Sequence, residues 1–195
     1  GDLISREGPE AEADLIAVRD MLARFPGKVY HIAGNHCLAM PPERYKAITG
    51  LDNLYYTFAT HGIRFITLDG MDVSAINEPQ TKADRNLLAW YRDTVKAPFY
   101  CGAIGSQQLE WLVSELDLAL KNEEPVIILS HLPLLEETTD EKHGLLWNHE
   151  EVVAILLRYP NVRAVLSGHY HSAAQAVRGG IEFVVVEAFG GAGNI

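Results

Sequence analysis

The 195-residue chain has only two cysteines, Cys37 and Cys101, and they do not form a CxxC pair. This scarcity excludes a disulfide scaffold and a zinc site built from thiolates, and it predicts a reducing, cytoplasmic location. Long hydrophobic runs are missing as well. The apolar stretches 126–129 and 183–186 are far shorter than the roughly 18–20 residues of a membrane helix. We therefore expect neither a membrane-spanning segment nor a membrane partner.

Basic residues are also few, because 16 Lys and Arg stand against 26 Asp and Glu, which gives a formal net charge of −10. A protein that binds a nucleic-acid polymer through its phosphates needs a basic surface, so this function is disfavoured. An anionic small-molecule substrate must instead meet a local positive centre. Hydrophobic residues make up 48% of the chain, which predicts one folded domain over 1–195.

Apolar periodicity predicts helices and strands in mixed order along the chain. Helices are expected over 10–25, 82–94, 106–121 and 148–159, and strands over 28–33, 54–60, 63–69, 126–130, 162–167, 173–178 and 181–187. Ser106 and Asn148 are expected to cap the helices that they begin. The pattern predicts an α/β sandwich of mixed β-sheets flanked by helices, with 71–105 as an insertion.

Three of the predicted strands are followed by loops that carry Asn or His. These loops contain Gly34-Asn35-His36, His131 and Gly168-His169-Tyr170-His171. Ligands in layered α/β folds gather at the carboxyl ends of strands, so we expect the loops to meet at one site. With Asp2 they supply nitrogen and oxygen ligands, which suit Mn²⁺, Fe²⁺ or Zn²⁺ and predict a catalytic metal centre. His143, in the charged segment 135–144, is expected to face solvent.

The order of these motifs along the chain carries a family resemblance. The motifs are Gly1-Asp2, Gly34-Asn35-His36, Ser130-His131 and Gly168-His169-Tyr170-His171. This set resembles that of the calcineurin-like metallophosphoesterases, which hold two divalent metal ions about 3.5–4 Å apart in a phosphoester-cleaving site. The resemblance implies the same two-metal site here, with Mn favoured over Fe and Zn.

The same resemblance implies a role for each residue. Asp2 is the carboxylate that bridges both metals, and His171 belongs to the first metal. The implied ligands of the second metal are Asn35, His131 and His169. His36 is the nearby acid that stabilises or protonates the leaving oxygen, although orienting the substrate is an equally open role for it.

Two segments narrow the resemblance to one branch of the family. Phe99–Gly105 with 107–112, and Leu146–Glu150, are similar to the manganese-dependent ADP-ribose/CDP-alcohol diphosphatases. This implies attack of a metal-activated water on a pyrophosphate linkage, in a nucleoside diphosphate derivative such as ADP-ribose or CDP-choline. The candidate substrate-binding residues are Tyr100, Trp147 and His149, because aromatic rings suit a base. Core packing is the alternative for Tyr100 and Trp147.

Two departures from the family pattern leave other functions open. The family's Asp-x-His motif has no counterpart before Gly1-Asp2. We expect that motif and its strand to lie outside this chain. In that case the 195 residues by themselves could lack activity. Loss of the first metal is the alternative. Cys37 stands where the family usually has an acidic residue, which would orient the His36 ring. The rival functions are a non-catalytic interaction module and a cyclic-nucleotide phosphodiesterase. No oligomeric state is predicted.

Overall fold

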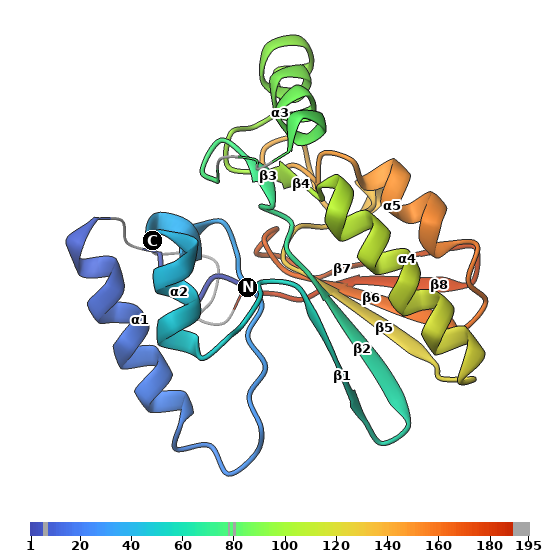
Figure 1. Cartoon of the computed structure of the whole chain (residues 1–195), viewed down its shortest axis with the longest axis horizontal. Helices are drawn as coiled ribbons and strands as arrows, with labels where there is room; N and C mark the ends of the chain where they lie inside the picture. Colours follow the sequence, from blue (N-terminus) through green and yellow to red (C-terminus); the bar gives the residue numbers. More distant parts are fainter. Residues whose placement is uncertain (6–7, 78, 80, 189–195) are drawn as a thin grey trace.

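A six-stranded mixed sheet forms the centre of the structure, a computed structural model that describes residues 1–5, 8–77, 79 and 81–188 (Figure 1). Its strands are β1 (Tyr56–Thr60), β2 (Ile63–Leu68), β5 (Val126–Ser130), β6 (Val162–Ser167), β7 (Ala174–Arg178) and β8 (Ile181–Val185). Their order across the sheet is β1-β2-β5-β6-β8-β7. The central strands β2, β5, β6 and β8 are parallel, and each edge strand runs antiparallel to its neighbour.

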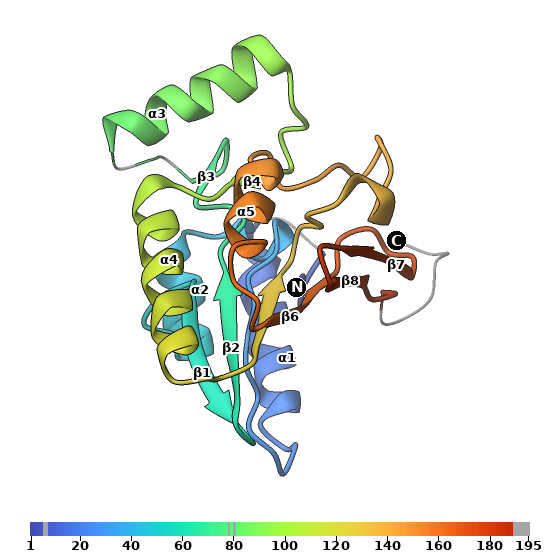
Figure 2. The same cartoon turned by 90° about the vertical axis from the view of Figure 1, so that its right-hand side faces the viewer.

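Helices lie on both sides of this sheet. The helices α1 (Pro9–Leu22) and α2 (Pro42–Thr49) lie on one side, and α4 (Ser106–Lys121) and α5 (His149–Leu156) lie on the other (Figures 1 and 2). Short helical turns are η1 (His36–Ala39) and η3 (Glu136–Thr138). The predicted mixed sheet with flanking helices is therefore confirmed. No helix among the described residues is long and apolar enough to cross a membrane.

The core is built from rows of side chains that run across neighbouring strands. Ile66, Ile128 and Val165 are in register on β2, β5 and β6, and each is at most 1% exposed. The same buried cluster includes Leu112 and Leu116 of α4. Parallel strands buried in this way are rigid supports, so the loops at their carboxyl ends start from fixed positions.

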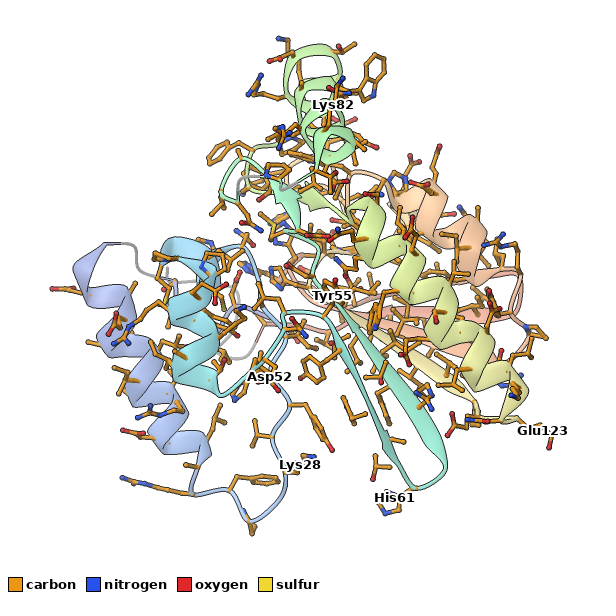
Figure 3. All side chains as sticks on the ribbon, in the orientation of Figure 1. Lys28, Asp52, Tyr55, His61, Lys82 and Glu123 are labelled. Carbon is orange, nitrogen blue, oxygen red and sulfur yellow. The ribbon has the colours of Figure 1, made fainter. Side chains whose placement is uncertain are left out.

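An arm projects from the sheet in the segment that was expected as an insertion (Figures 1 and 2). It consists of α3 (Lys82–Ala89) and the π-helical turn η2 (Trp90–Val95), which confirms the helix predicted there. Lys82 begins the arm, whereas His61 lies at the distant turn between β1 and β2 (Figure 3). The short antiparallel strands β3 (Val73–Ser74) and β4 (Gly102–Ala103) pair at its base.

A buried amide joins α4 to the segment that follows β2. Gln108 is 0% exposed. Its Oε1 accepts the N–H of Asp69 at 2.9 Å, and its Nε2 donates to the Asp69 carbonyl at 3.1 Å and to Asp72 Oδ2 at 3.0 Å. Burial and, to a smaller extent, the nearby Asp72 together raise the pKa of Asp69 to about 7. Gln108 therefore holds this acidic turn in place at the end of β2.

The strand predicted over 28–33 is wrong. Among the described residues this segment pairs with no other strand. Side chains hold it instead, since the Tyr56 hydroxyl donates to the His31 carbonyl at 2.8 Å and the ring of Tyr30 stacks on that of Phe58. An extended, apolar sequence becomes a strand only where a second backbone is available to pair with it.

The prediction that Ser106 caps α4 is also wrong, because Gly105 occupies the N-cap position. The first N–H groups are satisfied by carboxylates from outside the helix, since Ser106 N donates to Asp84 Oδ1 at 2.9 Å and Gly105 N donates to Asp72 Oδ2 at 3.0 Å. Asn148 does occupy the N-cap position of α5. Its side chain, however, bonds the backbone of Ile104 and makes no capping bond.

The first prediction concerns Gln108→Leu, which keeps the apolar bulk but leaves the partners of the amide unpaired in the interior. We expect the free energy of unfolding to fall by about 2–4 kcal/mol, because buried groups that lose a hydrogen bond carry their full desolvation cost. Urea denaturation measures the change. The matched control is Gln107→Leu at the exposed neighbouring position, and an equal loss in both variants would contradict the anchoring role of Gln108.

Candidate metal centre

Four side chains meet at the carboxyl ends of β5 and β6. His131 follows β5 directly and is 3% exposed. Its Nε2 lies 3.0 Å from Asn35 Oδ1, 3.2 Å from Asp2 Oδ2 and 3.1 Å from His169 Nδ1. The structure thus brings together Asp2, Asn35, His131 and His169, which come from distant parts of the sequence.

Asp2 reaches this cluster because residue 34 is glycine. A Cβ atom at residue 34 would overlap Asp2 Oδ1 and lie only 2.8 Å from the Asp2 backbone nitrogen. Asp2 Oδ1 also accepts the N–H of His36 at 2.9 Å, which ties the carboxylate to the start of η1. The other carboxylate oxygen remains directed at His131. The Gly-Asn-His motif therefore supplies space, a ligand-type oxygen and a backbone donor within three residues.

His169 enters the cluster from a tight loop after β6. The N–H of Gly168 donates to the His131 carbonyl at 3.0 Å, so the two histidine loops are joined through their backbones. His169 itself has a φ of 65° and His171 has a φ of 63°, both in the left-handed region. Such conformations cost of order 1 kcal/mol for residues other than glycine and recur at functional sites. The loop thus carries backbone strain where its side chain meets the cluster.

The charge states of the cluster suit metal binding. Burial acts to raise the pKa of Asp2, but the proximity of His131 and His36 outweighs it and lowers that pKa to about 2. Burial, with a smaller contribution from His131, lowers the pKa of His169 to about 4. Asp2 is therefore ionised and His169 neutral at neutral pH, which are the forms that coordinate metals.

The residues present fit a divalent cation. The neighbours of His131 Nε2 are a carboxylate oxygen, an amide oxygen and an imidazole nitrogen, and a single N–H could satisfy only one of them. Among the described residues, Asp2, His131 and His169 also offer ligand atoms within 4.8 Å of one another. A set of buried and half-buried nitrogen and oxygen ligands without thiolates matches Mn²⁺, Fe²⁺ or Zn²⁺.

His36 and Cys37 occupy different environments. His36 is half-buried, and in the part of the chain that the structure describes its Nδ1 has no hydrogen-bond partner. Cys37 is 0% exposed, and its Sγ contacts the carbonyl of Gly1 at 3.5 Å and the N–H of Leu3 at 3.4 Å. The thiol therefore faces the backbone near Asp2, and the side chain after His36 supplies no acceptor for the His36 ring.

The structure places the other predicted site residues at varying distances from the cluster. His171 is exposed, with its ring 6.0 Å from that of His143. Tyr100 is beside the cluster, since its ring lies 6.1 Å from that of His169. Trp147 stacks on Tyr91 at 5.2 Å, and His149 Nδ1 lies 2.9 Å from the Leu146 carbonyl. The roles assigned to these residues stay predictions.

One contact to the cluster was not predicted from the sequence, and it comes from His143. His143 was expected to face solvent, yet it is half-buried and its carbonyl lies 2.8 Å from His169 Nε2. A backbone carbonyl has no residue-specific signature, so the motif pattern gave no sign of this contact. The sequence feature that could have indicated a turn here is Gly144, whose φ of +76° turns the chain directly after His143.

Comparison with known proteins finds similar sequences over most of this chain. The family model for calcineurin-like phosphoesterases matches residues 1–173. A manganese-dependent ADP-ribose/CDP-alcohol diphosphatase from Arabidopsis thaliana is 34% identical over 197 residues, covering 88% of this chain and 63% of the relative. A protein of the same name from Oryza sativa subsp. japonica is 32% identical over 206 residues, covering 91% of this chain and 63% of the relative. The chain thus spans about 63% of the length of these relatives.

A solved structure shows the same fold. The crystal structure of a dimetal phosphatase from Danio rerio superimposes with a TM-score of 0.74 at 24% sequence identity. The match covers 91% of this chain and 66% of that chain. The arrangement of sheet and helices is therefore that of a dimetal phosphatase.

The second prediction is that Gly34→Ala weakens metal binding. The added Cβ displaces Asp2 from the cluster, and we expect the affinity for Mn²⁺, measured by titration calorimetry, to fall by roughly 10–100-fold. Gly168→Ala is the matched control, because its Cβ would lie no closer than 3.8 Å to His131 Nδ1. Equal affinities of the two variants would refute the close approach of Asp2 as the reason for glycine at 34.

The third prediction concerns the stability of the metal-free protein. The unfolded chain protonates His169 below about 6.5 and the folded chain below about 4, so the free energy of unfolding falls as the pH drops between these values. In His169→Gln this fall, between about pH 7 and about pH 4.5, is expected to be smaller by about 2 kcal/mol. Urea denaturation in the presence of a chelator, at about pH 7 and about pH 4.5, measures it. Parallel pH profiles of the two proteins would argue against a buried, neutral His169.

Proposed function

Because the chain belongs to the calcineurin-like phosphoesterase family, we propose that it is a metal-dependent hydrolase of the pyrophosphate linkage in nucleoside diphosphate derivatives. The plant relatives are named for ADP-ribose and CDP-alcohols, and we propose the same substrate class here. The observation that carries the proposal is the convergence of Asp2, Asn35 and His169 on one nitrogen of His131.

The proposed metal ligands are the four clustered side chains, and Mn²⁺ is the proposed metal. Divalent cations at this point would act as Lewis acids, would acidify water and would neutralise the charge of a diphosphate. A chain with a net charge of −10 needs such a centre to attract an anionic substrate. Asp2 contributes an ionised carboxylate, and His169 contributes a neutral imidazole. His171 stays the proposed ligand of the other metal ion.

His36 is the proposed proton donor to the leaving oxygen. Its backbone is fixed beside the cluster, because its N–H donates to Asp2 Oδ1 at 2.9 Å. His36 is half-buried, and its Nδ1 is buried without a hydrogen-bond partner among the described residues. A positioned imidazole is the usual general acid near neutral pH. Orienting the substrate through a hydrogen bond is the second role that this position supports.

The aromatic residues before β4 are the proposed contact for the base of the substrate. Tyr100 lies next to His169, and Phe99 lies one ring further out, with its ring 5.4 Å from that of Tyr100. Phe99 is 72% exposed, which leaves a ring free to stack. Binding energy from such a remote group can be used to orient the diphosphate. The proposed substrate roles of Trp147 and His149 rest on the sequence resemblance alone.

The fourth prediction is that a full-length protein, with the Asp-x-His motif included, hydrolyses ADP-ribose or CDP-choline in the presence of Mn²⁺ faster than p-nitrophenyl phosphate or a cyclic nucleotide. Product release measured by chromatography gives the rates. Removal of the metal by a chelator abolishes the reaction, and Mn²⁺ restores it. In His131→Ala we expect kcat/KM to fall by at least about 1000-fold, because the central ligand is lost.

The matched control for this experiment is His61→Ala. His61 lies at the turn between β1 and β2 (Figure 3), at the opposite end of the parallel strands from the cluster, and its removal is expected to leave the rates unchanged. A preference for cyclic nucleotides would reject the substrate class while keeping the phosphoesterase. Absence of hydrolysis together with absence of Mn²⁺ binding would instead favour the non-catalytic module.

A further inference from the structure

Both nitrogens of the His169 ring have defined neighbours. Nε2 lies 2.8 Å from the carbonyl oxygen of His143, and Nδ1 lies 3.1 Å from His131 Nε2. A carbonyl oxygen can only accept, so Nε2 must carry the hydrogen in this contact. The neutral ring then presents the lone pair of Nδ1 to the cluster. The carbonyl of His143 therefore selects the tautomer of His169 and fixes the direction of its ring.

This carbonyl is itself held by a tight turn over residues 139–144. Asp140 Oδ1 accepts the N–H of His143 at 2.8 Å and lies 2.7 Å from Nδ1 of the His143 ring. The N–H of Gly144 donates to the Asp140 carbonyl at 2.9 Å, and the Thr139 hydroxyl donates to the Gly144 carbonyl at 3.1 Å. The left-handed φ of Gly144, +76°, closes the turn. We call these six residues the 139–144 turn.

A second segment attaches to the same turn. The Tyr100 hydroxyl donates to the Lys142 carbonyl, and Cys101 Sγ lies 3.5 Å from the His143 carbonyl. The Tyr100 ring also lies beside the His169 ring. The ring of Tyr100 therefore lies beside His169, and its hydroxyl bonds the 139–144 turn. Three separate parts of the chain meet around one imidazole.

We propose that the 139–144 turn positions His169 for metal binding, with Asp140 and Tyr100 as positioning residues that act through the backbone. The proposal rests on the proposed metal site. Partners that orient metal-ligating histidines contribute roughly 10–100-fold in affinity. The side chain of Asp140 is 47% exposed, so its hydrogen bonds add little to global stability. Its effect is expected in the metal site rather than in the folding equilibrium.

The fifth prediction compares Asp140→Ala with Asp140→Asn. Both variants remove the same negative charge, but the amide oxygen of Asn still accepts the N–H of His143. We expect Asp140→Ala to bind Mn²⁺ roughly tenfold more weakly in titration calorimetry, and Asp140→Asn to bind nearly as the wild type. An equal loss in both would show that charge alone matters, and no loss in either would show that the turn is dispensable. Either result overturns the proposal.

A metal-free measurement separates this proposal from the function itself. Nitrogen-edited NMR spectra of the His169 ring should show a protected Nε2–H in the wild type and in Asp140→Asn, and should lose it in Asp140→Ala. If Asp140→Ala keeps this signal unchanged, the proposal fails whatever the metal affinity is. If the signals behave as expected but the wild type does not bind Mn²⁺, the proposed function fails and the positioning of His169 stands.

Tyr100→Phe gives an independent test of the second attachment. It removes the hydroxyl that reaches Lys142 but keeps the ring beside His169, so several-fold weaker Mn²⁺ binding is expected. Tyr170→Phe removes a hydroxyl from another ring beside the turn, since the ring of Tyr170 lies 5.3 Å from that of His143. The affinity of this control should equal that of the wild type. Equal losses in the two variants would contradict a specific role for Tyr100.

Discussion

The candidate site depends on one crowded nitrogen. His131 Nε2 is buried among a carboxylate oxygen, an amide oxygen and a second imidazole nitrogen. One hydrogen cannot satisfy these neighbours, so the arrangement is unfavourable unless a cation completes it. The fold maintains it because the parallel strands β5 and β6 place His131 and His169 at one edge of a close-packed sheet. The free energy gained by packing the core therefore offsets the unfavourable contacts around His131 Nε2.

Electrostatics connect this geometry to the proposed reaction. The chain is acidic overall, with a net charge of −10, and a diphosphate would be repelled by most of its surface. Asp2 stays ionised because His131 and His36 outweigh its burial, and His169 stays neutral because it is buried. The cluster thus combines charges and lone pairs that attract a cation, and the bound cation is what would attract the substrate.

Much of the fold and part of the site could be predicted from local sequence. Apolar periodicity identified all six strands of the central sheet and the helices α1, α3, α4 and α5. Hydrophobic patterning is a local property, so it predicts helices and strands without knowledge of which segments pack together. Asn and His directly after strands likewise indicated which loops meet, because parallel strands share their carboxyl edge. His131 and His169 were placed together on this basis. Asn35 was assigned to the site after a strand at 28–33 that the structure does not form, and Asp2 followed no predicted strand.

The sequence by itself thus determined which segments form elements and which loops converge. Only the tertiary structure decided the contacts whose partners are distant in the chain. Segment 28–33 has strand composition but pairs with no strand among the described residues, and α4 is capped by Asp84 rather than by Ser106. The carbonyl that orients His169 belongs to His143, and every residue has such a carbonyl. Backbone groups carry no sequence signal, so their roles follow from the folded geometry alone.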